Sequence, residues 1–345
     1  MKKISRREFI KGSLFLGFMG IFYMGFKQWA RKSGANSLGT PHYRALHKNG
    51  RLKKIGQELW DRMEKCDLCP RRCGANRLQG QEGFCHASSQ LEISSFHSHF
   101  GEERELVGKG GSGTIFMTNC SLRCVFCINW DISHEGKGRV EDIDDMANMM
   151  LDLQERGCHN INFVTPTHYV PHIVLAVDKA ASQGLRLPLV YNTCGWEQVD
   201  VLKKLDGIID IYLPDFKYAS GEMASKYSAG ANSYPEVTKA SLREMHRQVG
   251  DAKPKEDGLI DRGLMIRHLV MPNNVAGTKE VMEWIAKNLS KDTYVNIMSQ
   301  YQPCYRAFDY KEISRRITSQ EYREAVQYAF DAGLTNLKVQ SAHLL

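Results

Sequence analysis

The sequence lacks an apolar segment long enough for an ordinary membrane-spanning helix. Its N-terminal apolar run, Ser13 to Phe26, has 14 residues, whereas a spanning helix needs about 20. Arg6 and Arg7 precede this run in the order S-R-R-x-F-I-K, which is typical of a twin-arginine export signal, and no A-x-A cleavage pattern follows it. Residues 1–32 therefore predict an export signal or membrane anchor. The alternative is a cytoplasmic chain with an N-terminal arm.

Beyond residue 54 the chain lacks an excess of positive charge, although its formal net charge is +7. Residues 1–54 hold 13 of the 46 Lys and Arg and one of the 39 acids, Glu8, so 33 basic and 38 acidic residues leave a charge of −5 on the remainder. Nucleic-acid-binding domains instead gather basic residues on one face. The charge therefore argues against nucleic acid as a partner.

The glycine-rich stretch GKGGSGT, at residues 108–114, lacks the Gly-Lys-Ser/Thr order of a phosphate-binding P-loop. It also precedes an expected strand and does not join a strand to a helix. We expect it to lead into that strand and not to bind nucleotide.

The ten cysteines are not spread through the chain as in the disulfide frameworks of small secreted domains. Seven of them fall in two tight groups, which favours metal or iron–sulfur binding. The first group, CDLCPRRCGANRLQGQEGFC, contains Cys66, Cys69, Cys73 and Cys85. Four thiolates can complete a tetrahedral site. Zinc and a second iron–sulfur cluster both fit this spacing, and disulfide pairs or reduced structural thiols are the alternatives.

The second group, in TIFMTNCSLRCVFCINW, lacks a fourth thiol. Cys120, Cys124 and Cys127 follow an apolar run, and the next cysteine, Cys158, lies beyond an expected helix. A [4Fe–4S] cluster on three thiolates keeps one iron open to an exogenous ligand. An open coordination position distinguishes a reactive metal site from a structural one, so this spacing predicts a reactive cluster.

Strand and helix patterns alternate from residue 114 onward. Strands are expected at 114–119, 160–166, 187–193, 208–216, 263–272 and 293–301. Helices are expected at 140–156, 171–183, 196–206, 235–249, 278–290 and 319–333. Six successive strand–helix units require a parallel sheet with crossover helices. The fold class is therefore α/β, either an open doubly wound sheet or a partial (β/α)6 barrel.

Polar residues follow the expected carboxyl ends of these strands. In a TIM-like barrel such ends converge on one mouth, where catalysis takes place, and this favours the partial barrel. The expected organisation is a signal or anchor at 1–32, a linker and short helix at 33–60 outside the core, a cysteine-rich N-terminal module at 61–105 and the barrel at 106–345. The strand-end residues are Cys120, Thr165, Asn192, Asp215, Lys217 and Gln300.

The C-x3-C-x-Phe-C motif after the first expected strand resembles that of the radical S-adenosylmethionine (SAM) superfamily. The resemblance extends from about residue 60 to the C-terminus and is closest to PflX-type relatives of pyruvate formate-lyase activating enzyme. The segments that carry it are CDLCPRRCG, HYVPHI, VYNTCGW, DIYLPDFKY, IRHLVMP and MSQYQP. It implies a [4Fe–4S] cluster on Cys120, Cys124 and Cys127, with SAM on the open iron. It also implies a low-potential electron donor of the flavodoxin or ferredoxin type.

Such activating enzymes usually carry Gly-Gly-Glu after the second strand, where it contacts the amino group of SAM. This chain has VTPTHY there, with the hydroxyls of Thr165 and Thr167 but no carboxylate. His168 and His172 are expected to be structural residues and not metal ligands. The departure argues against a standard activating enzyme.

The resemblance places further residues at SAM. Asn192 and Thr193 are expected at its ribose or carboxylate, with capping of the next turn as the alternative for Asn192. Asp215 and Lys217 resemble the acid and lysine that contact the cofactor in this family, with a salt bridge at the rim as the alternative. Arg267, on the fifth strand, is expected to face the cofactor or substrate or to pair with an acid. Gln300 completes the set. Cys158 is expected to be structural, and Cys194 and Cys304 are expected to be buried spectators, with a substrate-side thiol or an extra ligand near the mouth as the alternative.

The implied reaction is reductive cleavage of SAM to a 5′-deoxyadenosyl radical that abstracts hydrogen from a substrate. Glycyl-radical activation of a partner protein and radical chemistry on another substrate both fit. The alternatives are an iron–sulfur electron-transfer protein without SAM chemistry and a zinc-stabilised, membrane-anchored binding protein.

Overall fold

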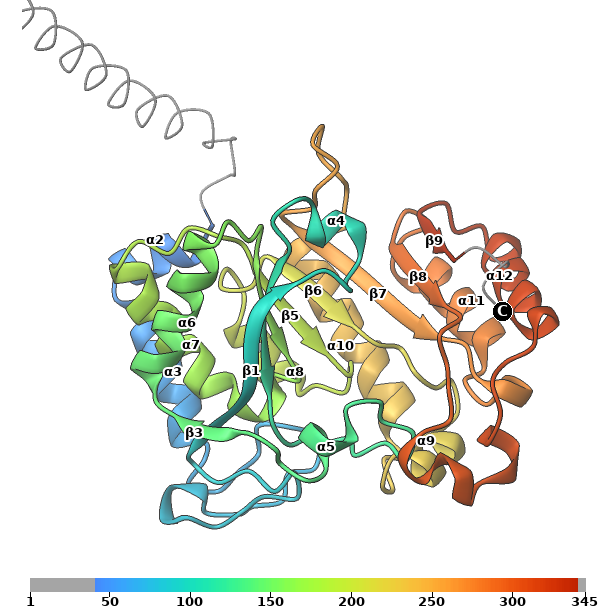
Figure 1. Ribbon diagram of the computed structural model, residues 1–345, viewed down its shortest axis with the longest axis horizontal. Coiled ribbons are helices and arrows are strands. Elements are labelled where there is room, and N and C mark those ends of the chain that lie inside the picture. Colours follow the sequence, from blue (N-terminus) through green and yellow to red (C-terminus); the bar gives the residue numbers. More distant parts are fainter. Residues whose placement is uncertain (1–40, 341–345) are drawn as a thin grey trace, which may run out of the picture. The chain divides into compact units, whose positions relative to one another are not determined.

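The computed structural model describes residues 41–340 (Figure 1). The expected export signal at 1–32 lies outside the described residues, as does the first part of the expected linker. Among the helices that are described, none is long and apolar enough to cross a membrane.

A nine-stranded sheet forms the centre of the fold, in the order β3-β1-β2-β4-β5-β6-β7-β8-β9. From β2 to β9 neighbouring strands run parallel, whereas β1 pairs antiparallel with both β2 and β3. The order ends at β3 and β9, so the sheet is not closed. The strands are β1 (Leu91–His99), β2 (Ser112–Met117), β3 (Arg139–Glu141), β4 (Ile161–Val164), β5 (Leu189–Thr193), β6 (Ile211–Pro214), β7 (Gly263–Leu269), β8 (Tyr294–Met298) and β9 (Leu337–Val339).

Helices connect the parallel strands, which confirms the α/β class. Asp142 and Thr318 begin two of them with capping boxes, in which side chains satisfy the free amides of the first turn. The connecting helices are α6 (Ile143–Glu155), α7 (Val170–Ser182), α8 (Val199–Lys204), α10 (Tyr234–Val249), α11 (Thr278–Asn288) and α12 (Ser319–Asp331). Shorter helices are α4 (Arg104–Val107), α5 (Trp130–Ser133) and α9 (Gly221–Tyr227). Single 3-10 turns are η1 (Arg77–Gln79), η2 (Thr167–Tyr169), η3 (Pro272–Asn274), η4 (Tyr305–Asp309) and η5 (Lys311–Ile313).

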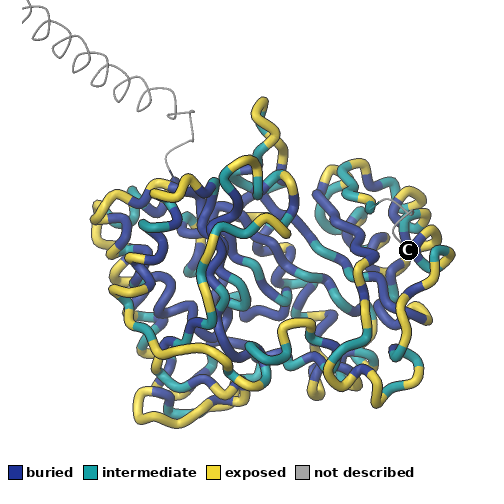
Figure 2. The backbone as a smooth tube through the Cα atoms, in the orientation of Figure 1, coloured by how far each residue is buried: buried dark blue, intermediate teal, exposed yellow. Residues whose placement is uncertain are grey.

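The expectation that residues 33–60 lie outside the core is wrong for the described part. This part forms α2 (Tyr43–Lys48) and α3 (Arg51–Asp61), and Leu52 and Leu59 are fully buried. A Cβ on Gly56 would come within 2.6 Å of Leu175 on α7, so the two helices pack closely through this glycine. Figure 2 shows the buried backbone continuing from the sheet into these helices.

The sheet is strongly curved, as shown by side chains of distant strands that meet on its inner face. Asn162 on β4 donates to Glu102 at 3.1 Å, and Asn296 on β8 donates to Glu103 at 2.8 Å. Four strand spacings separate β4 from β8, which is about 19 Å in a flat sheet. Arg267 on β7 bonds to both carboxylates, so the two glutamates lie side by side and the strands bend around them.

A small apolar cluster fills the inside of the curve near α4. In Figure 1, α4 lies near the amino ends of the strands, whereas α5 and α9 lie near their carboxyl ends. The cluster consists of Leu106, Val190, Ile211, Leu213, Ala252, Ile260, Met265 and Tyr294.

Candidate active site

The three-cysteine loop follows β2 and turns at two residues with left-handed backbone. Asn119 and Arg123 have φ angles of 68° and 53°, which is unusual for a residue as long as arginine. Other elements hold the peptide groups of the loop, since His134 bonds to the Cys124 carbonyl at 2.9 Å and the Arg306 amide donates to the Val125 carbonyl at 3.0 Å. The loop is thus fixed by contacts from both sides.

Each of the three sulfurs of this loop accepts a hydrogen bond. Such donors stabilise thiolates and tune the potential of iron–sulfur clusters. The pairs are Ser228 Oγ to Cys124 Sγ at 3.1 Å, Ser133 Oγ to Cys127 Sγ at 3.1 Å, and the Leu122 amide to Cys120 Sγ at 3.4 Å.

Burial raises the pKa of Cys124 to about 12 and that of Cys127 to about 11, while Lys217 acts in the opposite direction on both. Within the described residues, no three His, Cys, Asp or Glu side chains are placed to hold one metal ion. In an iron–sulfur cubane each thiolate binds a different iron, so its ligands need not converge on one point. Three thiols with one donor each, beside a cation, fit such a cluster.

Asp215 and Lys217 come together at the end of β6. Lys217 Nζ donates to Asp215 Oδ2 at 2.6 Å, and the lysine backbone amide donates to Tyr234 Oη at 2.9 Å. Although burial opposes its charge, Asp215 and Cys124 raise the pKa of Lys217 above its usual value. The predicted acid and lysine therefore form an ion pair. The lysine lies close enough to Cys124 and Cys127 to lower the pKa of both thiols.

Thr165 ends β4 in a strained conformation. Its φ is 59°, which is a genuine outlier for a β-branched residue and is characteristic of functional positions. Its amide donates to the Asn192 carbonyl at 2.9 Å, so two predicted residues are neighbours across β4 and β5. The geometry singles out Thr165 within VTPTHY.

Glu197 is a candidate site residue that was not expected from the sequence. Thr167 donates to it at 2.6 Å, and Thr193 and Tyr191 donate to it as well. It is 1% exposed, and burial raises its pKa to about 7. A carboxylate thus lies beside VTPTHY although that segment has none. The signal was present in VYNTCGWE, where an acid follows closely after the strand.

Arg267 lies beside the Asp215–Lys217 pair in the sheet, because its backbone is bridged to that of Asp215, but its side chain bonds to other acids. Arg267 bonds to Glu103 through Nε at 2.8 Å and also pairs with Glu102, and its contact with Asn192 is a long 3.4 Å. Glu103 is held by this guanidinium, which lowers its pKa to about 2 although burial acts to raise it. Gln300 accepts a hydrogen bond from Gln340 at 3.1 Å. Neither glutamate was singled out in the sequence, because only the fold brings 102–103 to β7.

The histidines and cysteines that were expected to be structural all contact other groups, but the expected burial is wrong for Cys194 and Cys304, which are partly exposed. His168 bonds to the Thr118 carbonyl at 2.8 Å, and burial lowers its pKa to about 3. His172 bonds to the Ser89 carbonyl at 2.8 Å. Cys158 lies 3.1 Å from Ser98 Oγ, and Cys304 Sγ lies 3.3 Å from the Phe126 carbonyl. Burial, with Cys120 nearby, raises the pKa of Cys194 far above its usual value.

The four-cysteine group lies between α3 and β1. Cys66, Cys69 and Cys85 are buried and Cys73 is exposed. A Cβ on Gly83 would lie 3.3 Å from Cys73 Sγ and 3.4 Å from Cys85 Sγ, so these two sulfurs share one small space that a side chain would enter.

Arg77 is completely buried beside this group. Its guanidinium donates to the carbonyls of Ser88 at 2.6 Å and His168 at 2.8 Å, and Nη1 lies 3.9 Å from Cys66 Sγ. Among the described residues its hydrogen bonds therefore go to carbonyls and a thiol and not to a carboxylate. Burial raises the pKa of Cys85 to about 11 against the opposite effect of Arg77.

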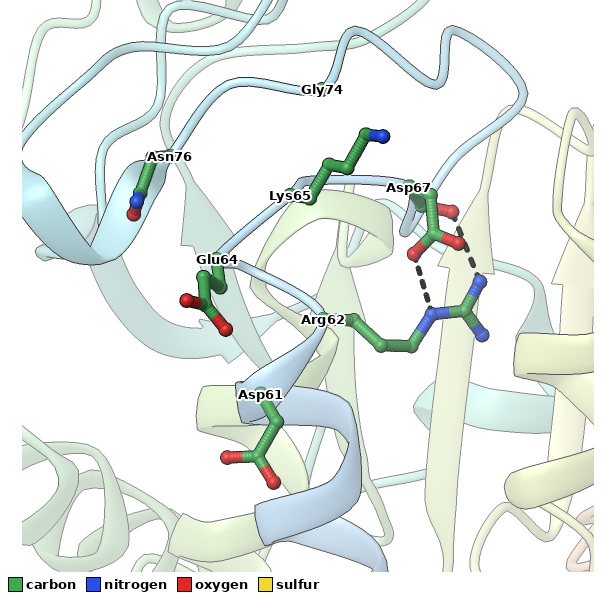
Figure 3. A pocket seen from close by; sticks show the side chains of 7 residues that line it. All are labelled: Asp61, Arg62, Glu64, Lys65, Asp67, Gly74 and Asn76. Atoms are coloured by element: carbon green, nitrogen blue, oxygen red, sulfur yellow. Dashed lines mark hydrogen bonds and ion pairs between the residues drawn. The ribbon is translucent and has the colours of Figure 1, made fainter.

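A solvent-open groove of about 700 Å³ lies on the outside of the same region (Figure 3). Arg62 in it pairs with Asp67 at 2.6 Å and with Asp200 at 2.7 Å. None of its lining residues is a cysteine or a strand-end residue, so the groove is separate from the candidate site. The lining residues are Asp61, Arg62, Glu64, Lys65, Asp67, Gly74 and Asn76.

The sequence matches one protein superfamily and one individual protein. The radical SAM superfamily matches residues 114–285. An uncharacterised protein of Methanocaldococcus jannaschii, MJ0674, is 32% identical over 276 residues, which cover 77% of this chain and 74% of that protein.

Two solved structures are similar at 11% identity. TYW1 with a lysine-pyruvate adduct bound has a TM-score of 0.39, covering 61% of this chain and 70% of that one. HydG, a maturase of the [FeFe]-hydrogenase, has a TM-score of 0.45, covering 64% of this chain and half of that one. These likenesses are too distant to carry an argument about function.

Proposed function

The chain belongs to the radical SAM superfamily and is a radical SAM enzyme, and from this premise we propose that Cys120, Cys124 and Cys127 hold its [4Fe–4S] cluster. The observation that carries the assignment is the hydrogen-bond donor on each of the three sulfurs, beside the buried Lys217. When bound, cluster and SAM supply a 5′-deoxyadenosyl radical by one-electron cleavage of the sulfonium C–S bond.

Residues of this chain bind and orient the cofactor. The Asp215–Lys217 pair offers both signs of charge at the end of β6, which suits the amino and carboxylate groups of SAM. Thr165 and Asn192 offer polar groups at the ends of the two neighbouring strands. Because Thr167 and Thr193 are both bonded to Glu197, we assign these two threonines to holding the strand ends in place and not to direct contact with SAM.

Arg267 and Gln300 are the outer members of the proposed set. Arg267 supports the polar layer below the cofactor through its glutamates, and Gln300 borders the site at the end of β8. We further propose that the curved, open sheet is a partial TIM-like barrel, since the strands bend around Glu102 and Glu103.

The four-cysteine group is proposed to bind a second metal, either an iron–sulfur cluster or zinc. Among the described residues no three His, Cys, Asp or Glu side chains are placed to hold one metal ion, so a cluster, whose thiolates bind different irons, fits better than a single zinc ion. A buried guanidinium without a carboxylate partner is costly, and an all-thiolate metal site would supply the missing negative charge beside Arg77. The nearby glycine at position 83 leaves room around two of the sulfurs.

We propose a PflX-type reaction, in which the radical abstracts hydrogen from a substrate, with glycyl-radical activation of a partner protein as one form. Because the reaction consumes one electron at low potential, we propose a flavodoxin or ferredoxin as donor. Membership in a family of enzymes favours this function over the electron-transfer alternative.

Export or anchoring through residues 1–32 stays a prediction. Fractionation of tagged protein tests it, and a cytosolic pool with an intact N-terminus would contradict it.

The experiment is anaerobic reconstitution followed by dithionite and SAM. Wild-type protein should release 5′-deoxyadenosine, and Cys124→Ala should not. Cys158→Ala is the matched control, because this thiol lies against Ser98 and away from the loop, and it should retain activity. A fully assembled, reducible cluster that leaves SAM intact would contradict the proposal.

A further inference from the structure

Arg71 belongs to the four-cysteine group in sequence but bonds to other parts of the chain. Its guanidinium donates to the carbonyls of Ser121 at 2.9 Å, Ala229 at 2.8 Å and Ser228 at 3.2 Å, with Leu122 at 3.5 Å. These acceptors lie in two separate segments, the three-cysteine loop and the turn after α9. One side chain therefore ties both segments to the four-cysteine group.

Both of these segments carry donors to the cluster sulfurs. Leu122 supplies the amide that donates to Cys120 Sγ, and Ser228 supplies the hydroxyl that donates to Cys124 Sγ. A change in the position of the Arg71 guanidinium would therefore move two of the three donors. Partners of this kind, one bond removed from a metal ligand, typically change affinity or activity 10- to 100-fold when lost.

The other side of Arg71 depends on the four cysteines. Cys69 and Cys73 flank it closely in the chain, and its guanidinium packs 3.9 Å from the ring centre of Phe84, which precedes Cys85. Trp196 contacts it from the side of the sheet at 4.8 Å. A metal that joins Cys69, Cys73 and Cys85 would fix the backbone on both sides of this arginine.

We propose that Arg71 is a positioning residue through which metal occupancy of the four-cysteine group sets the hydrogen bonding, and hence the properties, of the three-cysteine cluster. The inference rests on the proposed second metal site. It makes the four-cysteine group a regulator of the radical reaction and not only a structural support.

The test compares Arg71→Gln with Arg72→Gln in the full chain. Arg72 is the neighbouring arginine and is exposed, and the side chain that its guanidinium contacts is Gln198, so its variant controls for loss of charge. Arg71→Gln should retain the iron and sulfide of the three-cysteine cluster. Its midpoint potential and its electron paramagnetic resonance change on SAM binding should differ from wild type, and the KM for SAM should rise about tenfold. Arg72→Gln should match wild type.

The second half of the test removes the second metal with Cys66→Ser/Cys69→Ser. On the wild-type background this should reproduce the spectral and KM changes of Arg71→Gln. Combined with Arg71→Gln it should add little, because coupled sites are non-additive. Additive effects, or an Arg71→Gln protein with a wild-type spectrum, would overturn the inference.

Three failures are distinguishable in these measurements. Wild-type protein without SAM cleavage would contradict the proposed function, and a four-cysteine group that binds no metal would contradict both the second site and the inference. Cleavage and a second metal with independent variants would contradict the inference alone.

Discussion

The two cysteine groups differ in where their sulfurs find partners. The three-cysteine loop receives hydrogen bonds on all its sulfurs, two of them from Ser133 and Ser228 outside the C-x3-C-x2-C segment. The four-cysteine group instead faces a buried arginine, Arg77, and the small space beside Gly83. The first arrangement suits a reactive cluster whose reduction potential is tuned by hydrogen bonds, and the second suits a closed, charged metal site. The number of thiols alone therefore does not separate a reactive site from a supporting one.

The largest expected effect is the loss of SAM cleavage when the three-cysteine group is removed. The metal of the four-cysteine group should stay in place. Cys120→Ala/Cys124→Ala/Cys127→Ala should lose all 5′-deoxyadenosine formation while retaining the metal of the four-cysteine group. Iron, sulfide and zinc analysis measures this. If the triple variant loses both metals, the two groups form one site and the comparison fails.

Lys217→Met removes a cation that acts to lower the pKa of both Cys124 and Cys127. The variant leaves Asp215 without its partner at 2.6 Å, and we expect a loss of about 2 kcal/mol in unfolding free energy, since the pair is about one-fifth exposed. SAM cleavage should fall roughly 100-fold. Lys279→Met, at an exposed lysine on α11, is the control for loss of charge in denaturation and rate measurements. Equal rates of SAM cleavage in both variants would show that Lys217 is not part of the site.

Glu197 predicts a pH dependence of stability. Its pKa is raised by burial from 4.5 to about 7, so the native state binds a proton that the unfolded state has already released. Its contribution is therefore present below about pH 4.5 and is lost as the pH rises through 7, by up to about 3 kcal/mol. Glu197→Gln should flatten the decrease in unfolding free energy between pH 5 and 8. Asp210, with a pKa of about 7, supplies the remaining slope, and an unchanged slope would contradict the assignment.

Arg77→Met tests the charge of the four-cysteine group, and its expected effect on stability is the smallest of these predictions. With metal bound, loss of the buried guanidinium should destabilise the protein by about 2 kcal/mol, because a negative site loses its cation. After chelation of the metal the same variant should lose less stability, because only the hydrogen bonds to the carbonyls of Ser88 and His168 are then lost. Arg72→Met serves as the exposed control in thermal unfolding. An equal loss of stability in both states would show that the group carries no compensating charge.

The sequence predicted local and periodic features well. The expected helices and parallel strands are present, because apolar periodicity and capping residues such as Thr318 act over a few positions. Three strands were missed: β3, which takes the first two positions of the helix expected at 140–156, and β1 and β9. β1 reads LEISSFHSH, with few apolar residues, and β9 has three residues, so neither gives a periodic signal. β1 lies in the expected module at 61–105 and yet pairs with β2 in the sheet.

The partners of the strand-end residues were harder to predict, because they come from distant parts of the chain. Glu103 reaches Arg267 across 164 positions, and Ser228 reaches Cys124 across 104. Only the folded topology brings such pairs together. Thr165 could be named from its place after a strand, but its strained backbone follows from the loop around it.

The buried side chain of Arg77 has a consequence for how the protein can be divided. It joins the turn at Arg77–Gln79 to the His168 carbonyl, and the ring of His168 is bonded to Thr118, just before the three-cysteine loop. Cutting the chain between the four-cysteine group and the sheet would remove the donor of the His168 carbonyl and expose the apolar surface that both parts bury. The N-terminal cysteines and the catalytic strands should therefore unfold in a single cooperative transition, and a truncated fragment of either should be insoluble.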